Sequence, residues 1–272
     1  MKSPVPYFGS KQRIAPWIVS LLPAHEHYVE PYAGSLSVLL AKRPSRMETV
    51  NDLDGDLMTF WRVLRDRPAD LIRVCALTPH SRAEQAAAYE PTTDELETAR
   101  RVWCRLAQGR AGTLRNTGWR HYIAPAGSST SMPGYMDGYV DRMAAAAERL
   151  HAVSLESLPA LTLIGKYGGC PEVLLYVDPP YLGSTRPHSN YRVEMKGEAE
   201  HRELADALAD CRAAVVLSGY DSPLYAELYA GWRRYEQQTM TGNAQTAKGR
   251  TEVLWSNREL AGRIALFEEV PA

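Results

Sequence analysis

Apolar residues follow two patterns that alternate along the chain. Short runs without a polar interruption, such as Val173–Val177, are rich in strand-forming residues and are typical of strands buried on both faces of a parallel sheet. Other segments carry apolar residues three or four positions apart, as at Leu57, Phe60 and Leu64, and this spacing predicts amphipathic helices. The alternation therefore predicts an α/β fold with a mainly parallel sheet.

The predicted elements divide the chain into an α/β body and a helical insertion. Strands are predicted to lead into Glu30 and Asn51 and to cover 173–177, 213–218, 233–240, 251–256 and 264–267. Helices are predicted near 14–22, 36–41, 54–66, 69–77, 82–89, 92–108, 138–151 and 157–167, with two more on either side of the strand at 213–218. No strand signal lies between 67 and 150, so this part is interpreted as an insertion.

The buried run at 173–177 ends in Asp178-Pro179-Pro180-Tyr181. Open α/β sheets bind ligands just beyond the carboxyl ends of their strands, where Asp178 is placed. The prolines stiffen the backbone, so the carbonyls of Asp178 and Pro179 are held in place. An acid and a carbonyl can accept both hydrogens of an exocyclic amine, while the ring of Tyr181 stacks on the heterocycle. A strand ending in a plain proline turn explains these four residues almost as well.

A second candidate site follows the first predicted strand. The strand ends at Glu30, a turn at Ala33-Gly34-Ser35 follows, and Asp52 comes 22 positions after Glu30. An acid at this distance holds the ribose hydroxyls of nucleosides in Rossmann-like units. Pyrophosphate needs several glycines for close approach, whereas this turn has one, so S-adenosylmethionine, which has no phosphate, fits better. The alternative is a plain βαβ unit in which Asp52 caps the next helix.

Composition narrows the classes of protein that remain. The chain has 272 residues, a formal charge of −1 and 45% hydrophobic residues, as expected of one large domain or of one domain with an insertion. No run approaches the roughly 18 apolar residues of a membrane span. The four cysteines are widely separated, which favours reduced thiols in a cytoplasm over disulfides or zinc. Near-neutral charge argues against general coating of nucleic acid and leaves room for a local basic patch.

Such a patch is predicted between Glu97 and Asp137, an interval without any acid. Its arginines are Arg100, Arg101, Arg105, Arg110, Arg115 and Arg120. Asn116, Trp119 and Tyr122 lie among the last three in a loop rich in Gly, Ser, Thr and Pro. Guanidinium groups with aromatic rings and amides grip phosphates and read bases. A solvated helix face explains the first three arginines equally well, but not those of the loop.

Six segments in this order resemble the DNA adenine methylase family of N6-adenine DNA methyltransferases. These segments are 6–11, 28–35, 50–54, 176–181, 216–221 and 251–257. The resemblance covers nearly the whole chain outside the insertion. It implies a Rossmann-like S-adenosylmethionine-dependent methyltransferase sheet, formed by 1–66 and 151–272, with a mainly helical DNA-recognition domain inserted at 67–150.

The resemblance also implies roles for individual residues. The catalytic residues are Asp178, Pro179, Pro180 and Tyr181. The cofactor-binding residues are Tyr7, Gly9, Lys11, Glu30, Ala33, Gly34, Ser35, Asp52 and Asp178. The candidate DNA-binding residues come instead from the arginine-containing loop and from the loop after Tyr181, and they are Arg110, Arg115, Asn116, Trp119, Arg120, Tyr122, Arg186 and Tyr191. Two departures stand out: Ser35-Leu36-Ser37 replaces smaller residues, and Pro159 replaces an acid that meets the cofactor's adenine amine in relatives.

The implied cofactor is S-adenosylmethionine and the implied substrate is an adenine flipped out of duplex DNA. Neither a metal ion nor a membrane is expected as a partner. The protein is expected to be of bacterial or bacteriophage origin and to act in the cytoplasm. A cognate restriction endonuclease is a possible partner, and the chain is expected to be a monomer or weak dimer. N4-cytosine methylation uses the same geometry, although Asp before Pro-Pro-Tyr favours adenine. Protein glutamine methylation fits less well, and a catalytically idle DNA-binding protein of the same fold is the alternative from another class.

Overall fold

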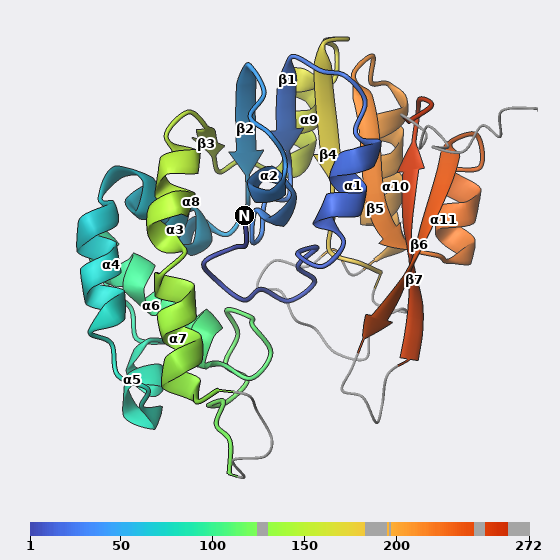
Figure 1. The fold of residues 1–272 in the computed structure, drawn as a ribbon. Helices are drawn as coiled ribbons and strands as arrows, with labels where there is room; N and C mark the ends of the chain where they lie inside the picture. Colours follow the sequence, from blue (N-terminus) through green and yellow to red (C-terminus); the bar gives the residue numbers. More distant parts are fainter. Residues whose placement is uncertain (124–129, 183–194, 196, 242–247, 261–272) are drawn as a thin grey trace, which may run out of the picture.

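The computed structural model describes residues 1–123, 130–182, 195, 197–241 and 248–260 (Figure 1). Within these residues seven strands form one sheet in the order β3-β2-β1-β4-β5-β7-β6. The strands are β1 (His27–Glu30), β2 (Met47–Asn51), β3 (Ser154–Glu156), β4 (Val173–Val177), β5 (Ala214–Tyr220), β6 (Arg233–Thr241) and β7 (Lys248–Ser256). Pairing is parallel from β3 to β5, and β7 runs antiparallel between β5 and β6. The predicted Rossmann-like α/β fold is confirmed.

Helices cover both faces of this sheet. They are α1 (Ala15–Leu21), α2 (Ser37–Ala41), α3 (Gly55–Asp66), α4 (Pro68–Ala76), α5 (Arg82–Ala87), α6 (Glu95–Gln108), α7 (Met132–Val140), α8 (Met143–Leu150), α9 (Ala160–Tyr167), α10 (Glu198–Ala209) and α11 (Pro223–Leu228). Leu174 of β4 belongs to a core shared with α1, α2 and α3, while its neighbour Leu175 belongs to a core shared with α9, α10 and α11. All five residues of β4 are buried because the strand has a core on each side.

The parallel register brings the loops after three strands to one edge of the sheet. His27 of β1 lies opposite Met47 of β2 and Val173 of β4. The segments that begin at Pro31, Asp52 and Asp178 therefore leave the sheet side by side, at the edge where open α/β sheets bind ligands.

The helical insertion forms a lobe beside the sheet (Figure 1). Its helix α6 packs against α3, and Trp103 of α6 lies in the same core cluster as Trp61 of α3. Helix α8 returns the chain along α3 to the sheet. Because the insertion shares a core with one face of the sheet, the two parts pack as one body. The division at 67 and 150 remains a prediction.

Several predicted boundaries change. The single helix predicted at 138–151 is wrong, since α7 ends at Val140 and α8 starts at Met143. Strand β3 was not predicted, because three half-exposed residues at a sheet edge leave no apolar run. Helix α9 starts only after Pro159, and the predicted strand at 264–267 lies outside the described residues. No helix among the described residues is long and apolar enough to cross a membrane.

Candidate active site

A cavity of about 310 Å³ opens at the edge where β1, β2 and β4 end. Its size is at the lower end of the range for small-molecule sites, roughly 300–1,000 Å³. The wall includes every residue predicted to bind the cofactor: Tyr7, Gly9, Lys11, Glu30, Ala33, Gly34, Ser35, Asp52 and Asp178. Of the remaining catalytic motif, Pro180 lines the cavity and Tyr181 lies buried behind it. The structure thus brings the two candidate sites of the sequence together in one place.

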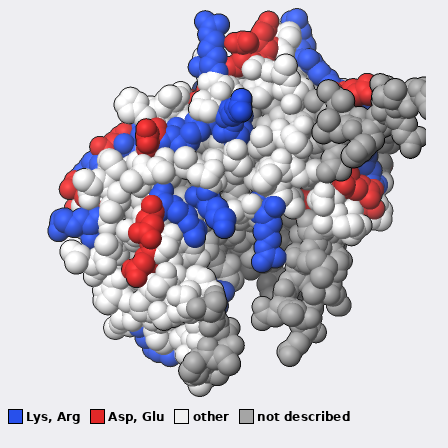
Figure 2. All heavy atoms as spheres, viewed as in Figure 1, with Lys and Arg blue, Asp and Glu red and all other residues white. Residues whose placement is uncertain are grey.

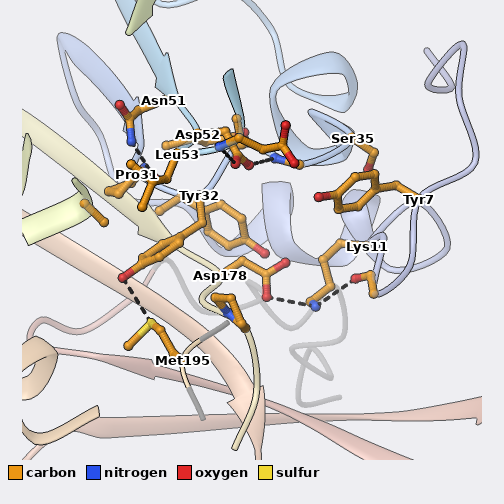
Figure 3. A pocket seen from close by; sticks show the side chains of 18 of the residues that line it. Tyr7, Lys11, Pro31, Tyr32, Ser35, Asn51, Asp52, Leu53, Asp178 and Met195 are labelled. Atoms are coloured by element: carbon orange, nitrogen blue, oxygen red, sulfur yellow. Dashed lines mark hydrogen bonds and ion pairs between the residues drawn. The ribbon is translucent and has the colours of Figure 1, made fainter. Parts of the chain in front are cut away.

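Asp52 forms one end of this cavity (Figure 3). Its carboxylate accepts hydrogen bonds from the backbone N–H of Gly34 at 3.0 Å and of Asp54 at 3.0 Å. Burial raises the pKa of Asp52 to about 6 even though these N–H groups oppose the shift. The acid predicted to hold a ribose is therefore fixed in direction and faces the cavity.

The glycine turn adopts a backbone conformation that few residues tolerate. Gly34 has φ +47°, and a Cβ at this position would lie 3.2 Å from the ring of Tyr7. Leu36 follows in the same left-handed region, with φ 55°. The hydroxyls of Ser35, Ser10 and Ser37 bond one another at 2.7 to 3.0 Å and join the turn to the N-terminal loop. The wall of the cavity is thus close-packed backbone at this point.

Asp178 and Lys11 face each other in the wall of the same cavity (Figure 3). Lys11 Nζ lies 2.9 Å from Asp178 Oδ1 and 3.2 Å from the carbonyl oxygen of Gly9. Burial raises the pKa of Asp178 to about 6, Lys11 lowers it, and the nearby Glu252 raises it further. The negative charge of Asp178 is therefore only partly balanced by Lys11. Because Asp178 lines the cavity, a ligand can contact its carboxylate.

Tyr181 is held by polar groups behind the cavity. Its hydroxyl accepts a hydrogen bond from Lys11 and donates one to Glu252 Oε1 at 2.7 Å. Tyr181 is 8% exposed, and its ring packs against the ring of Tyr220, with centroids 4.5 Å apart. The stacking of this ring on a heterocycle stays a prediction.

Glu30 connects the first strand to the helix that follows the glycine turn. Its Oε1 accepts hydrogen bonds from the hydroxyl of Tyr28 and from the backbone N–H of Leu39 at 2.9 Å. Burial raises the pKa of Glu30 to about 8, so the buried carboxyl is mainly neutral at pH 7. Its position in the wall is observed, whereas its contact with the cofactor stays a prediction.

Other wall residues were not assigned from the sequence. Tyr32, Asn51 and Leu53 line the cavity beside the predicted residues (Figure 3). Asn51 accepts a hydrogen bond from the N–H of Leu158 at 2.7 Å, and its amide donates to the Leu158 carbonyl at 3.0 Å. Asn51 thereby holds the loop that leads into Pro159. The sequence could have pointed to Asn51, because this residue lies in one of the segments that resemble the methylase family. It was not selected because its amide does not indicate a particular ligand.

The arginine-containing loop packs against the N-terminal side of the cavity. Its ends pair through Arg110 N–H to the Gly118 carbonyl at 3.2 Å and Arg120 N–H to the Gln108 carbonyl at 2.7 Å. At its middle, the Gly112 carbonyl accepts a hydrogen bond from Phe8 N–H at 2.7 Å. The segment predicted to read DNA is therefore in direct contact with the segment that carries Tyr7 and Lys11.

The predicted DNA-binding side chains differ in how they are engaged. The ring of Trp119 stacks with His80 and His121, with centroids 4.4 and 5.0 Å apart, so it braces the loop from inside. Arg120 donates to the hydroxyl of Tyr122 at 2.7 Å. Arg110, Arg115 and Asn116 are exposed. The remaining two, Arg186 and Tyr191, lie outside the described residues.

The helical arginines of the same interval are bound to acids. Arg100 pairs with Glu97 and Glu84, and Arg101 pairs with Glu97. Basic side chains also gather along the upper margin of the hollow beside the helical lobe (Figure 2). Only part of the arginine-rich interval is therefore available to phosphates.

Comparison with known proteins shows which proteins the chain resembles. Residues 7–101 match the model of the D12 class N6 adenine-specific DNA methyltransferases. The type II methyltransferase M1.LlaDCHI of Lactococcus lactis subsp. cremoris is 24% identical over 269 residues, covering 92% of this chain and 93% of that protein. The retron Ec67 DNA adenine methylase of Escherichia coli is 24% identical over 272 residues, covering 93% and 90%. Over residues 7–101 the chain is thus similar to D12 class N6 adenine-specific DNA methyltransferases, and over nearly its whole length to these two methylases.

The likeness to solved structures is looser. The rRNA methyltransferase aviRa of Streptomyces viridochromogenes superposes with a TM-score of 0.38 at 14% identity, covering 92% of this chain and 85% of that one. The resemblance to DNA adenine methylases therefore depends on the sequence matches, and the fold on the sheet order above. The methylase family uses S-adenosylmethionine as its cofactor. No group of three metal-ligating side chains is found in the described ranges.

Proposed function

We propose that this chain transfers a methyl group from S-adenosylmethionine to the N6 amine of an adenine extruded from duplex DNA, and that the cavity described above is where it does so. One observation carries the proposal. A nucleoside-type acid, Asp52, and an amine-gripping acid, Asp178, lie in the wall of the same cavity although 125 residues separate them in sequence. The proposal thus assigns both halves of a methyl-transfer site to this one cavity.

The cavity suits the cofactor at the end near Asp52. The Asp52 carboxylate, directed by two backbone N–H groups, would accept the ribose hydroxyls. Leu53 and Leu161 are 48% and 39% exposed in the wall and would pack on the faces of the adenine ring. Lys11, Gly34 and Ser35 would surround the amino-acid part. S-adenosylmethionine supplies the methyl group from its sulfonium and leaves as a neutral thioether.

The residues after β4 would hold the target amine. Asp178 and the Pro179 carbonyl would accept its two hydrogens, which turns the nitrogen lone pair toward the methyl group. Lys11 engages Asp178 Oδ1, so we assign the amine to Oδ2. With its pKa raised to about 6, Asp178 is also suited to accept the proton that the methylated nitrogen loses. Positioning and electrostatics would supply most of the acceleration.

The insertion would bind the DNA around the target. Arg110, Arg115, Asn116, Arg120 and Tyr122 would contact phosphates and base edges from the loop that touches Phe8. Trp119 would support this loop from within, which refines the base-reading role expected of it. Residues 67–150 would then be the recognition domain, as the sequence predicts.

Product analysis tests this function. DNA from cells that lack other adenine methylases and express the chain is digested and its nucleosides are measured by mass spectrometry, with empty-vector DNA as the control. We expect N6-methyladenine. N4-methylcytosine instead would favour the cytosine alternative. No modified base, together with no binding of labelled S-adenosylmethionine at millimolar concentration, would indicate an idle DNA-binding protein.

The cellular setting is also part of the proposal. A bacterial or phage-infected cytoplasm is supported by the bacterial sources of both relatives. A cognate restriction endonuclease agrees with the type II name of one relative, and a monomer or weak dimer stays a prediction.

A further inference from the structure

A buried acid on the antiparallel strand β7 stands behind the catalytic motif. Glu252 is 4% exposed, although it lies in a strand whose next three residues, Val253 to Trp255, are buried and apolar. A charged side chain is expensive to bury unless it is hydrogen-bonded and paired. No role has been assigned to Glu252 so far.

Three groups converge on one oxygen of this acid. Glu252 Oε1 accepts hydrogen bonds from Tyr181 at 2.7 Å and from Ser218 at 2.8 Å. Lys11 Nζ lies 3.5 Å from the same oxygen and 2.9 Å from Asp178 Oδ1. Lys11 also donates to the Tyr181 hydroxyl, so lysine, tyrosine and Glu252 form a continuous chain of polar contacts. Glu252 therefore touches both residues that flank Asp178 in space.

We propose that Glu252 is a positioning residue for methyl transfer, acting through Lys11 and Tyr181. It shares the ammonium of Lys11 with Asp178 and fixes the Tyr181 hydroxyl. Without Glu252, Lys11 would pair with Asp178 alone and weaken it as a hydrogen-bond acceptor. The inference rests on the proposed function of the same cavity and adds a residue that touches neither substrate nor cofactor.

Other groups around Asp178 set its charge together with Glu252. The titratable side chains that act on it or are acted on by it are Lys11, Glu30, Tyr176, Tyr181, Tyr225 and Glu252. Of the two other carboxyls in this group, Glu252 raises the pKa of Asp178. Removing the charge of Glu252 should therefore lower the pKa of Asp178. Shortening its side chain while the charge is kept should not lower it.

Two substitutions separate the effect of the Glu252 charge from the effect of its side-chain length. Glu252→Gln keeps an oxygen for Tyr181 and Ser218 but removes the charge. The acid limb of kcat/KM for DNA against pH, measured at saturating S-adenosylmethionine so that protonation of Asp52 does not contribute, is expected near pH 6 in the wild type and should move to lower pH. Glu252→Asp keeps the charge but is one methylene shorter. Here kcat should fall by up to roughly 100-fold while the acid limb stays closer to that of the wild type.

The matched control is Glu236→Gln on the neighbouring strand β6. Glu236 is 49% exposed and pairs with Arg234, and it lies opposite Val253, next to Glu252 in the register. This variant should keep the kcat and the pH profile of the wild type. A second readout needs neither cofactor nor DNA: the Asp178 carboxyl signal in carboxyl-carbon NMR, assigned by its loss in Asp178→Asn, should titrate at lower pH in Glu252→Gln.

The outcomes are distinguishable from failure of the proposed function. A wild-type protein that makes no N6-methyladenine refutes the function itself. An active wild type whose acid limb is unmoved in Glu252→Gln overturns the inference, as does wild-type kcat in Glu252→Asp. Should Glu252→Gln fail to fold, Glu252→Asp and its kcat decide alone.

Discussion

Two buried ion clusters of this protein are built in opposite ways. At the start of β2, the single acid Glu48 faces two cations: Lys42 Nζ at 2.7 Å and Arg149, whose Nη2 lies 2.8 Å from Oε1. The backbone N–H of Ser45 donates to the same oxygen at 3.0 Å. At the end of β4, by contrast, two acids, Asp178 and Glu252, share the ammonium of Lys11.

The difference separates structural from functional use of buried charge. Around Glu48 the donors outweigh the burial penalty, and the pKa of this carboxyl is lowered. Arg149 comes from α8, so the saturated cluster fastens the insertion to the sheet. Burial outweighs the one cation around Asp178, and its pKa is raised to about 6. An under-compensated carboxylate in a cavity wall is able to bind a further N–H group, whereas a saturated one is not.

Removing the charge of Glu48 should have the largest effect on stability. Glu48→Ala leaves Lys42 and Arg149 buried without their acid, and breaking a buried pair costs about 3–5 kcal/mol. Chemical denaturation should show this loss in the free energy of unfolding. Glu95→Gln, which breaks an exposed pair with Arg62, is the control and should leave the denaturation midpoint unchanged. A Glu48→Ala protein as stable as the wild type would show that the cluster of Glu48, Lys42 and Arg149 does not stabilise the fold.

Asp52→Asn should weaken the cofactor rather than the fold. The charged acceptor of the ribose hydroxyls is lost, and hydrogen bonds to charged groups contribute about 1.5–3 kcal/mol. Calorimetric titration should therefore show an S-adenosylmethionine Kd raised by roughly 10- to 100-fold. In the wild type the affinity should also fall as the pH drops below about 6, because Asp52 then gains its proton. An unchanged Kd in the variant would remove Asp52 from the site.

Gly34→Ala tests the close-packed turn between the two acids. The left-handed backbone costs a residue with a Cβ about 1–2 kcal/mol, and the new methyl group would press on the Tyr7 ring at 3.2 Å. Both stability and cofactor affinity should decrease. The control is Gly165→Ala in α9, where a Cβ meets nothing within 4 Å and should stabilise the helix by about 0.5–1 kcal/mol. Equal behaviour of the two variants would contradict the tight turn.

Arg115→Ala should have the smallest effect. Loss of one phosphate contact weakens DNA binding similarly for all sequences and reduces the slope of log K against log salt by about 1. Arg101→Ala is the comparison, because Glu97 already holds that guanidinium. Its salt slope should equal that of the wild type. An unchanged slope for Arg115→Ala would show that Arg115 does not contact a phosphate and that another arginine of the loop makes this contact.

The sequence predicted the parts of the molecule that local pattern controls. The buried run of β4 and the acid after it need only a short stretch of chain to be recognised, and so does the turn at Gly34. The predicted cofactor residues meet in one cavity because parallel strands bring their carboxyl ends to the same edge.

What the sequence could not give depends on pairing between distant segments. Glu252 meets Lys11 only because β7 is inserted antiparallel beside β5, with Ser218 opposite Leu254. The sequence does show an acid, Glu252, inside an apolar strand. Its partners, however, are determined by the register between β5 and β7, which the sequence pattern does not reveal. Likewise, one of the two stacking partners of Trp119 is His80, which lies 39 positions earlier in the chain. The short edge strand β3 carries too little apolar patterning to be recognised at all.

Methyl transfer by Asp178→Asn, measured together with its thermal unfolding and its cofactor binding, tests the central claim most directly. The variant replaces the amine's acceptor by an amide of the same shape. We predict a loss of kcat of at least roughly 1,000-fold, with a melting temperature and an S-adenosylmethionine affinity close to those of the wild type. A folded variant that still methylates adenine at a near-normal rate would contradict the assignment of Asp178 as the acid that grips the amine.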